Sequence, residues 1–223
     1  MKKTLALLAV VGCLAIAGSA FATLPCAANS SCAIEVQNGN GCTTADLRWC
    51  PAGDMDHIII RVTVRNCLDD PLEGCVVRLD LSGQSDAMDG TSAMGVCGTM
   101  SSTATSDANG AVAFDLTGGG CGRFVLDWTA TAECADPEVE LCANSTELCA
   151  KSPDFNGDLT INFFDTFKFL PALNAGTGYC ADFNCDNVVN FFDTFQFLPH
   201  LNHGGGCVGW TLTDAALGTC PLP

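Results

Sequence analysis

One stretch of sequence that occurs twice constrains this chain more than any other feature. Residues 154–174 read DFNGDLTINFFDTFKFLPALN, and residues 182–202 read DFNCDNVVNFFDTFQFLPHLN. Each copy is too short to bury an apolar face alone, so the repeat predicts two copies of one small unit that pack against each other. In the first twelve residues of each copy, Asp, Asn, Asp, Asn and Asp stand at positions 1, 3, 5, 9 and 12.

This spacing of oxygen-bearing side chains matches a calcium-binding loop. Calcium takes six to eight oxygen ligands, and such a loop also supplies a backbone carbonyl at position 7. We therefore expect two Ca²⁺ ions, against the alternative of two ordinary acidic turns. The predicted ligands are Asp154, Asn156, Asp158, Thr160 (carbonyl), Asn162 and Asp165 in the first loop, and Asp182, Asn184, Asp186, Val188 (carbonyl), Asn190 and Asp193 in the second.

Apolar residues follow each loop at helical spacing. After the first loop, residues 163, 164, 167 and 170 form one apolar stripe of a predicted short helix, which Pro171 should end. The second copy repeats this pattern. We interpret the pairs Phe163–Phe164 and Phe191–Phe192 as part of the core between the two units, in preference to an exposed apolar interface.

The two loop–helix units together resemble a dockerin, a module of two calcium loops, each followed by one helix, that usually ends a secreted chain. The resemblance covers about residues 152–203, and it implies that the twelve residues above bind calcium and that the module docks to a protein partner, cohesin-like or on the cell surface. Position 6, usually Gly, is Leu159 or Asn187 here, so we expect the Leu159 loop to be strained and to bind more weakly. Positions 10 and 11, small and polar in cellulosomal dockerins, are the Phe pairs, which argues against cohesin binding of the cellulosomal type.

The first 22 residues have the features of a secretory signal peptide. Lys2 and Lys3 precede an apolar run, and Ala20-Phe21-Ala22 has the form of a cleavage site. The alternative is a lipoprotein signal built on Cys13. Since no second apolar span follows, we expect a protein that is secreted or on the cell surface, without a membrane span.

The mature chain is strongly acidic. Without Lys2 and Lys3 it has 25 acidic and seven basic residues, a formal charge of −18. This charge disfavours nucleic acid and anionic membranes as partners and favours divalent cations, although solubility alone could account for much of it.

Fifteen of the 16 cysteines remain after removal of the signal peptide. In an exported chain this number indicates disulfide bonds rather than zinc or redox sites, and no CxxC motif occurs. Cys67 and Cys75 flank a turn that a disulfide could cross, and residues 180, 185, 207 and 220 form an even set of four cysteines. Fifteen is odd, so at least one thiol is free or pairs with another molecule.

Alternating apolar residues predict β-strands in the middle of the chain, over residues 58–64, 77–81, 112–116 and 124–130. Weaker strands are expected at residues 32–37 and 100–105, and residues 82–105 are expected to be mainly a long connection. The motifs VTVRNCLDDPLEGCVVRL and TSDANGAVAFDL, followed by a strand ending in TATA, resemble bacterial immunoglobulin-like modules of the invasin and adhesin type, over residues 54–132.

The predicted fold class is mainly β, with an immunoglobulin-like β-sandwich followed by a small α-helical dockerin-like domain. Residues 133–151 either add a last strand or link the two parts. The expected segments are residues 1–22 (signal peptide), 23–53 (Cys-rich), 54–150 (sandwich and connecting strand or linker), 151–203 (dockerin-like) and 204–223 (Cys-containing tail).

No catalytic motif is present, so we expect no enzyme. His200 and His203 precede a run of three glycines, which favours a flexible end over a zinc site. The first functional hypothesis is a non-catalytic assembly or adhesion protein whose immunoglobulin-like module is presented or anchored by the calcium-binding end. The alternative is an accessory carbohydrate-binding subunit of an extracellular polysaccharide-degrading system, for which Trp49 and Trp210 could stack on sugar rings.

Overall fold

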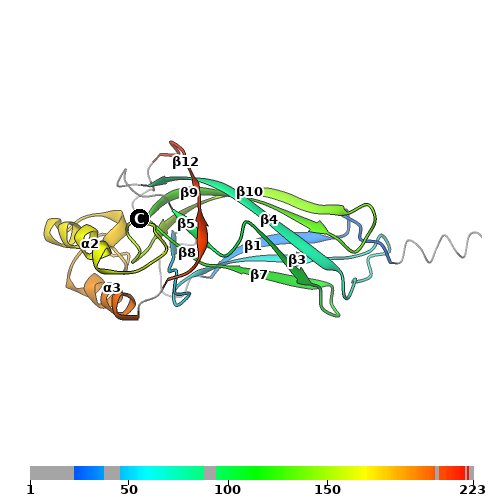
Figure 1. Cartoon of the computed structure of the whole chain (residues 1–223), viewed down its shortest axis with the longest axis horizontal. Helices are drawn as coiled ribbons and strands as arrows, with labels where there is room; N and C mark the ends of the chain where they lie inside the picture. Colours follow the sequence, from blue (N-terminus) through cyan, green and yellow to red (C-terminus); the bar gives the residue numbers. More distant parts are fainter. Residues whose placement is uncertain (1–22, 38–45, 88–93, 204–205, 219, 221–223) are drawn as a thin grey trace, which may run out of the picture.

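The computed structural model describes residues 23–37, 46–87, 94–203, 206–218 and 220, and the predicted signal peptide lies outside this range. The fold is mainly β (Figure 1). The strands are β1 (Ser31–Gln37), β2 (Asp46–Arg48), β3 (His57–Thr63), β4 (Val76–Ala87), β5 (Gly95–Cys97), β6 (Ser101–Thr105), β7 (Ala111–Leu116), β8 (Gly118–Gly119), β9 (Gly122–Ala132), β10 (Val139–Lys151), β11 (Gly209–Thr211) and β12 (Thr213–Asp214). The described helices are α2 (Phe163–Ala175), the short 3₁₀ helix η1 (Tyr179–Ala181) and α3 (Phe191–His203).

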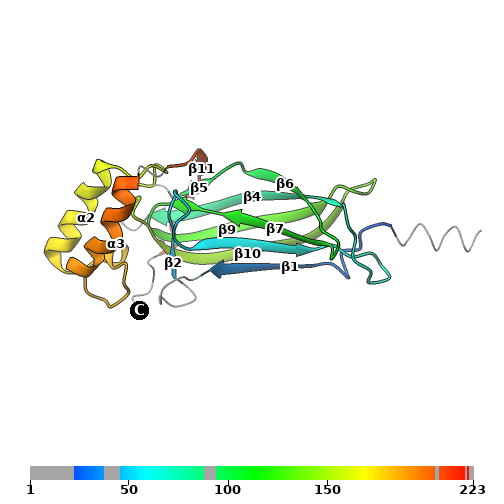
Figure 2. The ribbon, with the colours of Figure 1, turned by 90° about the horizontal axis from the view of Figure 1, so that it is seen from below.

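The strands form three sheets. One has the order β1-β3-β7, the largest has the order β12-β4-β9-β10-β2 with β6 also pairing with β4, and a small one has the order β11-β5-β8. The long strands run along the molecule, and α2 and α3 lie together at one end of the sheets (Figures 1 and 2). None of the described helices combines the length and the apolar character that a membrane crossing needs.

A single apolar core joins the two larger sheets. Alternate residues of β3, among them Ile58 and Ile60, pack into the same cluster as Leu79 of β4 and Phe124 of β9. Because successive side chains of a strand point to opposite faces, this alternation buries one face of each sheet. The four strands predicted from alternation are confirmed, as are the weaker ones at residues 32–37 and 100–105.

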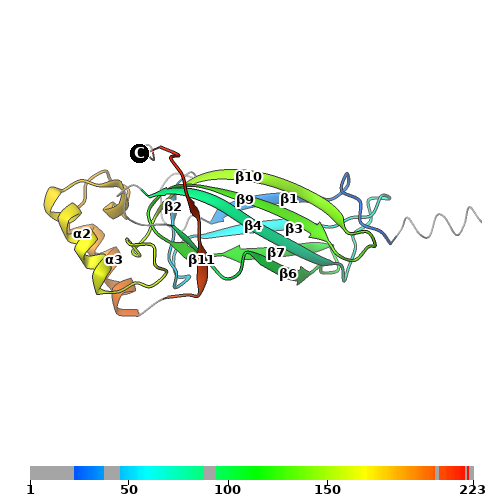
Figure 3. The same ribbon diagram turned by 45° about the horizontal axis from the view of Figure 1, so that its top comes forward.

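The structure extends the strands beyond the predicted limits. β4 continues to Ala87, so the expected connection over residues 82–105 begins later and also contains β5. Residues 139–151 form β10, which pairs with β9 along its length, so this segment is a strand rather than a linker. Residues 209–214 of the predicted tail return to the sheets as β11 and β12 (Figure 3).

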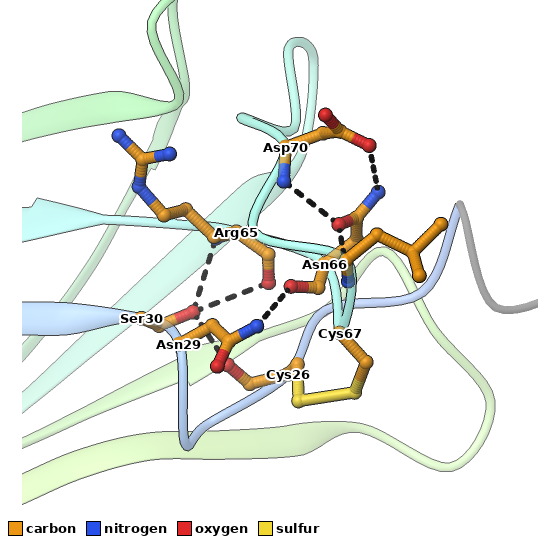
Figure 4. Close-up of a disulfide and its surroundings, with 8 residues drawn as sticks. Cys26, Asn29, Ser30, Arg65, Asn66, Cys67 and Asp70 are labelled. Carbon is orange, nitrogen blue, oxygen red and sulfur yellow. Dashed lines mark hydrogen bonds between the residues drawn. A yellow bond between two sulfur atoms is a disulfide. The ribbon is translucent and has the colours of Figure 1, made fainter.

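Six disulfide bonds are described, and their pairing differs from the one expected across the first turn. Cys67 pairs with Cys26, and Cys75 pairs with Cys134. The turn is instead closed by hydrogen bonds, since Asn66 Oδ1 accepts from the backbone N–H groups of Leu68 and Asp70 at 2.8 and 2.9 Å (Figure 4). Cys67 is thus available to hold the N-terminal segment, where Ser30 and Asn29 also bond to the backbone of residues 65 and 66.

Three other disulfides join the sheets to the chain that follows β10. They are Cys121–Cys180, Cys97–Cys207 and Cys149–Cys220. The predicted set of four cysteines therefore does not pair within itself: three of its members bond to cysteines in or beside the sheets. Cys185 is also disulfide-bonded, and Cys50 is the free cysteine of the described residues. Cross-links of this number are typical of proteins that fold in an oxidising compartment.

The Cys121–Cys180 bond should hold the loop–helix region against the sheets. We expect the double substitution Cys121→Ser, Cys180→Ser to lower the free energy of unfolding by about 2–4 kcal/mol and to increase protease cleavage within residues 152–203. Limited proteolysis with mass spectrometry of the fragments measures this. The matched control is Cys26→Ser with Cys67→Ser at the far end, and equal cleavage of residues 152–203 in both variants would contradict the expectation.

Candidate functional site: two acidic loops and two phenylalanine faces

The first acidic loop is held closed by hydrogen bonds from its backbone N–H groups to its own carboxylates. Asp154 Oδ2 accepts a hydrogen bond from the backbone N–H of Leu159 at 2.9 Å. Asp165 accepts from the N–H groups of Asn156 and Asn162 at 3.2 and 2.8 Å. The carboxylates at positions 1 and 12 are thereby held inside the loop.

The second loop repeats these contacts. Asp182 accepts from the N–H of Asn187 at 3.2 Å, and Asp193 accepts from those of Asn184 and Asn190 at 3.2 and 2.9 Å. In both loops, positions 4 and 6 adopt left-handed backbone conformations, with φ between 61° and 67°. The two copies of the repeat therefore share one loop geometry, and all twelve predicted ligands lie in these two loops.

Positions 9 and 12 also start the helices. Asn162 Oδ1 accepts from the N–H of Phe164 at 2.8 Å, and together with Asp165 it forms a capping box at the start of α2. In the second copy Asn190 accepts from the N–H of Phe192 at the same distance. Each loop is thus joined rigidly to its helix.

Leu159 adopts the left-handed conformation that position 6 requires, at φ 63°. For a residue with a side chain this conformation costs about 1–2 kcal/mol. However, the side chain is buried against two glycines of the small sheet, because a Cβ on Gly95 or Gly209 would lie only 2.8 or 2.6 Å from its methyl carbons. Burial of a leucine contributes about 1.5–3 kcal/mol, which offsets the strain. The expected weakness of the first loop thus loses its main physical reason.

The first loop gathers negative charge in a buried place. Burial and, secondarily, the charge of Asp165 raise the pKa of Asp154 to about 7, and burial also raises the pKa of Asp165. Asp154 Oδ1 is buried and has no hydrogen-bond partner. A buried carboxylate oxygen without a partner is costly unless a proton or a cation binds it, and the surrounding side chains supply the hard oxygen atoms that calcium prefers. The residues present therefore fit a calcium ion.

The second loop differs in having a lysine beside it. Lys151, at the end of β10, is fully buried and donates a hydrogen bond from Nζ to the backbone oxygen of Asp182 at 2.8 Å. Its Nζ lies 3.4 Å from Asp182 Oδ2 and 4.6 Å from the centre of the Tyr179 ring. This ammonium group ties the loop to the sheet and offsets part of its negative charge.

The helices continue beyond the predicted end. Pro171 lies inside α2, which ends at Ala175, and Gly176 caps it at φ 71° with its N–H directed at the carbonyls of Ala172 and Leu173. Because Pro171 has no N–H group, the carbonyl of Phe167 lacks its usual helical hydrogen bond. Both residues are exposed, so water can bind this carbonyl instead. α3 likewise continues past Pro199 to His203.

The buried phenylalanines are not the ones that were predicted to form the core. The core of the paired units is formed by Phe155, Phe169, Phe183 and Phe197, with Phe169 and Phe197 stacked at 4.6 Å between ring centres. These side chains occupy positions 2 and 16 of each copy. The repeat itself carries no signal that separates them from the exposed phenylalanines, because positions 10, 11 and 14 are also Phe in both copies.

The residues interpreted as core are exposed. In each copy two phenylalanine rings one helical turn apart are in contact, Phe163 with Phe167 and Phe191 with Phe195. The exposed fractions reach 67 % at Phe164 and 66 % at Phe192. We define the first phenylalanine face as Phe163, Phe164, Phe167 and Leu170, and the second as Phe191, Phe192, Phe195 and Leu198, all of them exposed.

Of the two tryptophans considered for sugar stacking, Trp49 is not available for it. Trp49 is fully buried and stacks on Phe124 at 5.2 Å between ring centres. Trp210 is partly buried and packs against the main core, and Trp128 is buried as its strand position predicts. The suggestion that Trp49 stacks on a sugar ring is therefore wrong.

The chain matches no protein-family model, and no curated protein matches it. The resemblances to dockerins and to bacterial immunoglobulin-like modules accordingly rest on the sequence motifs alone.

The two residues at position 6 provide a matched test of how the first loop is held. We expect Leu159→Gly to lower the free energy of unfolding by about 1–2 kcal/mol, because lost burial outweighs the relieved backbone strain. Asn187 occupies the same place in the second loop with an exposed side chain, so Asn187→Gly should be neutral or slightly stabilising. Denaturant unfolding measures both variants, and stabilisation by Leu159→Gly would show that its side chain does not anchor the loop.

Proposed function

We propose that this protein is a secreted, non-catalytic, calcium-binding assembly or cell-surface protein. In this proposal its β-sheets form an immunoglobulin-like module, and the dockerin-like loop–helix region docks to a partner protein. The observation that carries the proposal is the pair of equivalent acidic loops, each of which leads directly into a helix with an exposed phenylalanine face.

Calcium would act as a structural ion in both loops. The twelve predicted ligands supply six side-chain carboxylates, and without a cation these like charges oppose the closed loops. Binding would convert this repulsion into coordination and would stabilise the loops and the helix starts that they cap.

The exposed phenylalanine faces support docking to a protein. Contiguous exposed apolar patches on a soluble protein usually mark interaction sites, and aromatic residues dominate the energetics of such sites. The formal charge of the mature chain is −18, so two copies would repel each other at long range. We therefore favour a separate partner protein with an apolar surface and a neutral or basic rim over a second copy of this chain.

Removal of calcium should loosen the two loops. In the disulfide-intact protein we expect a chelator to increase amide hydrogen exchange in residues 154–165 and 182–193, and about millimolar calcium to restore protection. Asp154→Asn with Asp165→Asn should abolish the calcium response of the first loop. The control pair Asp127→Asn and Asp214→Asn removes the same charge from the sheets. Calcium-independent exchange in both loops of the unsubstituted protein would contradict calcium binding.

The docking proposal is tested by removing the phenylalanine faces. The immobilised protein would be incubated in calcium with surface and secreted proteins of the source organism, and a captured protein would be identified, purified and titrated against each variant. We expect Phe163→Ser, Phe164→Ser, Phe191→Ser and Phe192→Ser together to weaken that binding by about 100-fold or more, since interface aromatics carry about 2 kcal/mol or more each.

Leu68→Ser with Val208→Ser is the matched control, because both residues are exposed and apolar but lie outside the two faces. Equal binding of the control and the phenylalanine variants to the purified partner would contradict docking through the faces. Concentration-dependent association of the protein with itself, lost in the phenylalanine variants, would assign the faces to a second copy instead.

The alternative is a carbohydrate-binding subunit, and one observation favours it. A groove along β4, β9 and β10 is lined by residues that include Asp80, Asp127 and Asn144. Carboxylates and amides can hydrogen-bond sugar hydroxyls, but the tryptophan in this groove, Trp128, is buried. Binding of the protein to a glycan array, lost in Asp127→Ala, would establish this function.

A further inference from the structure

Three side chains with metal-binding chemistry meet where α3 approaches the sheets. Cys50 and Asp54 come from the segment between β2 and β3, and His200 comes from the last turn of α3. His200 Nδ1 lies 2.9 Å from Asp54 Oδ2 and 3.7 Å from Cys50 Sγ. The expectation of a flexible end at His200 is wrong, because this residue lies in a helix and is buried.

The geometry is unlike a catalytic triad. In a triad the base uses one ring nitrogen for the nucleophile and the other for the carboxylate. Here the thiol and the carboxylate both approach Nδ1 of His200. Burial also raises the pKa of the Cys50 thiol, so without a metal it is a poor nucleophile, and an ion that bound it would release its proton to solvent.

Convergence of the three ligand atoms on one point is what a metal ion requires. The sulfur, the nitrogen and the carboxylate oxygen all lie within 4.8 Å of one another. A tetrahedral zinc ion at its usual distances would hold such atoms about 3.4–3.6 Å apart, so the 3.7 Å sulfur–nitrogen separation fits and the 2.9 Å nitrogen–oxygen separation would have to widen by about 0.5 Å. Modest side-chain adjustments therefore suffice to coordinate an ion.

The ligand types select the metal. A thiolate and an imidazole suit zinc, whereas calcium takes oxygen ligands, so this cluster and the acidic loops would bind different ions. The Asp54 side chain is 37 % exposed, which leaves a route for the ion and a place for water as a fourth ligand.

We propose that Cys50, Asp54 and His200 form a zinc site that joins α3 to the segment between β2 and β3. This site would reinforce contacts already present at the same junction, where Arg48 donates a hydrogen bond to Gln196 of α3 at 3.2 Å. It also gives a role to Cys50, the free cysteine of the described residues.

The test uses the complete mature protein with its disulfides intact, without reductant, and with Zn²⁺ and Co²⁺ as probes. We expect one equivalent of Co²⁺ to give a sulfur-to-metal charge-transfer band, Zn²⁺ to displace it, and Zn²⁺ to protect Cys50 from alkylation. Cys50→Ser should lose the band, and His200→Asn should weaken zinc binding by about 100-fold or more, since even changes around a ligand weaken binding about 10–100-fold.

Leu68→Ser is the control, because this side chain is exposed and lies outside the phenylalanine faces and the proposed metal sites, so zinc binding should be unchanged. Asp54→Asn provides a variant at a partly exposed position should the two buried substitutions prevent folding, and it should also weaken zinc binding. Absence of the charge-transfer band in the folded protein, or equal zinc affinity in the Asp54→Asn variant, would overturn the proposal. Calcium binding by the acidic loops is a separate measurement that neither result changes.

Discussion

Attachment of the loop–helix region to one end of the sheets is the constraint on which the rest of the structure depends. That region has a small core of its own, dominated by four phenylalanines. The Cys121–Cys180 bond, the buried Lys151 and the side chain of Leu159 all join it to the sheets. These links position both acidic loops against the sheet end and leave the opposite side of the helices exposed.

This attachment explains why the repeat is not fully symmetric. The first loop meets the small sheet through Leu159, and the second meets β10 through Lys151. In the first loop the left-handed Leu159 is stabilised by a contact with the small sheet, whereas in the second loop a buried lysine of β10 contacts Asp182. The exposed sides of the helices touch no sheet, and both copies carry the same phenylalanine face there. This is expected if both faces bind the same kind of partner.

The proposed functions of the metals follow from ligand chemistry and location. Hard oxygen ligands lie within each loop and would stabilise the starts of α2 and α3, whereas the soft thiol of Cys50 lies at the junction of α3 with the sheets. Calcium would therefore order the docking region, and zinc would reinforce its connection to the β-sheets. The two kinds of site would therefore respond to different ions in the same environment.

Local patterns in the sequence determined the main strands and the two acidic loops of this protein. Alternation along β3, β4, β7 and β9 and the spacing of the two acidic loops depend on near neighbours, so the strands and the loop residues could be predicted. The disulfide partners, the exposure of Phe163 and Phe191, and the meeting of Cys50 with His200 could not. Each of these features depends on which distant segments of the chain come into contact. Cys121 and Cys180 are 59 residues apart. An apolar helical stripe looks the same in the sequence whether the rest of the protein or a partner covers it. Only the tertiary structure decided these points, because burial and ligand geometry arise from the packing of segments that are remote in the chain.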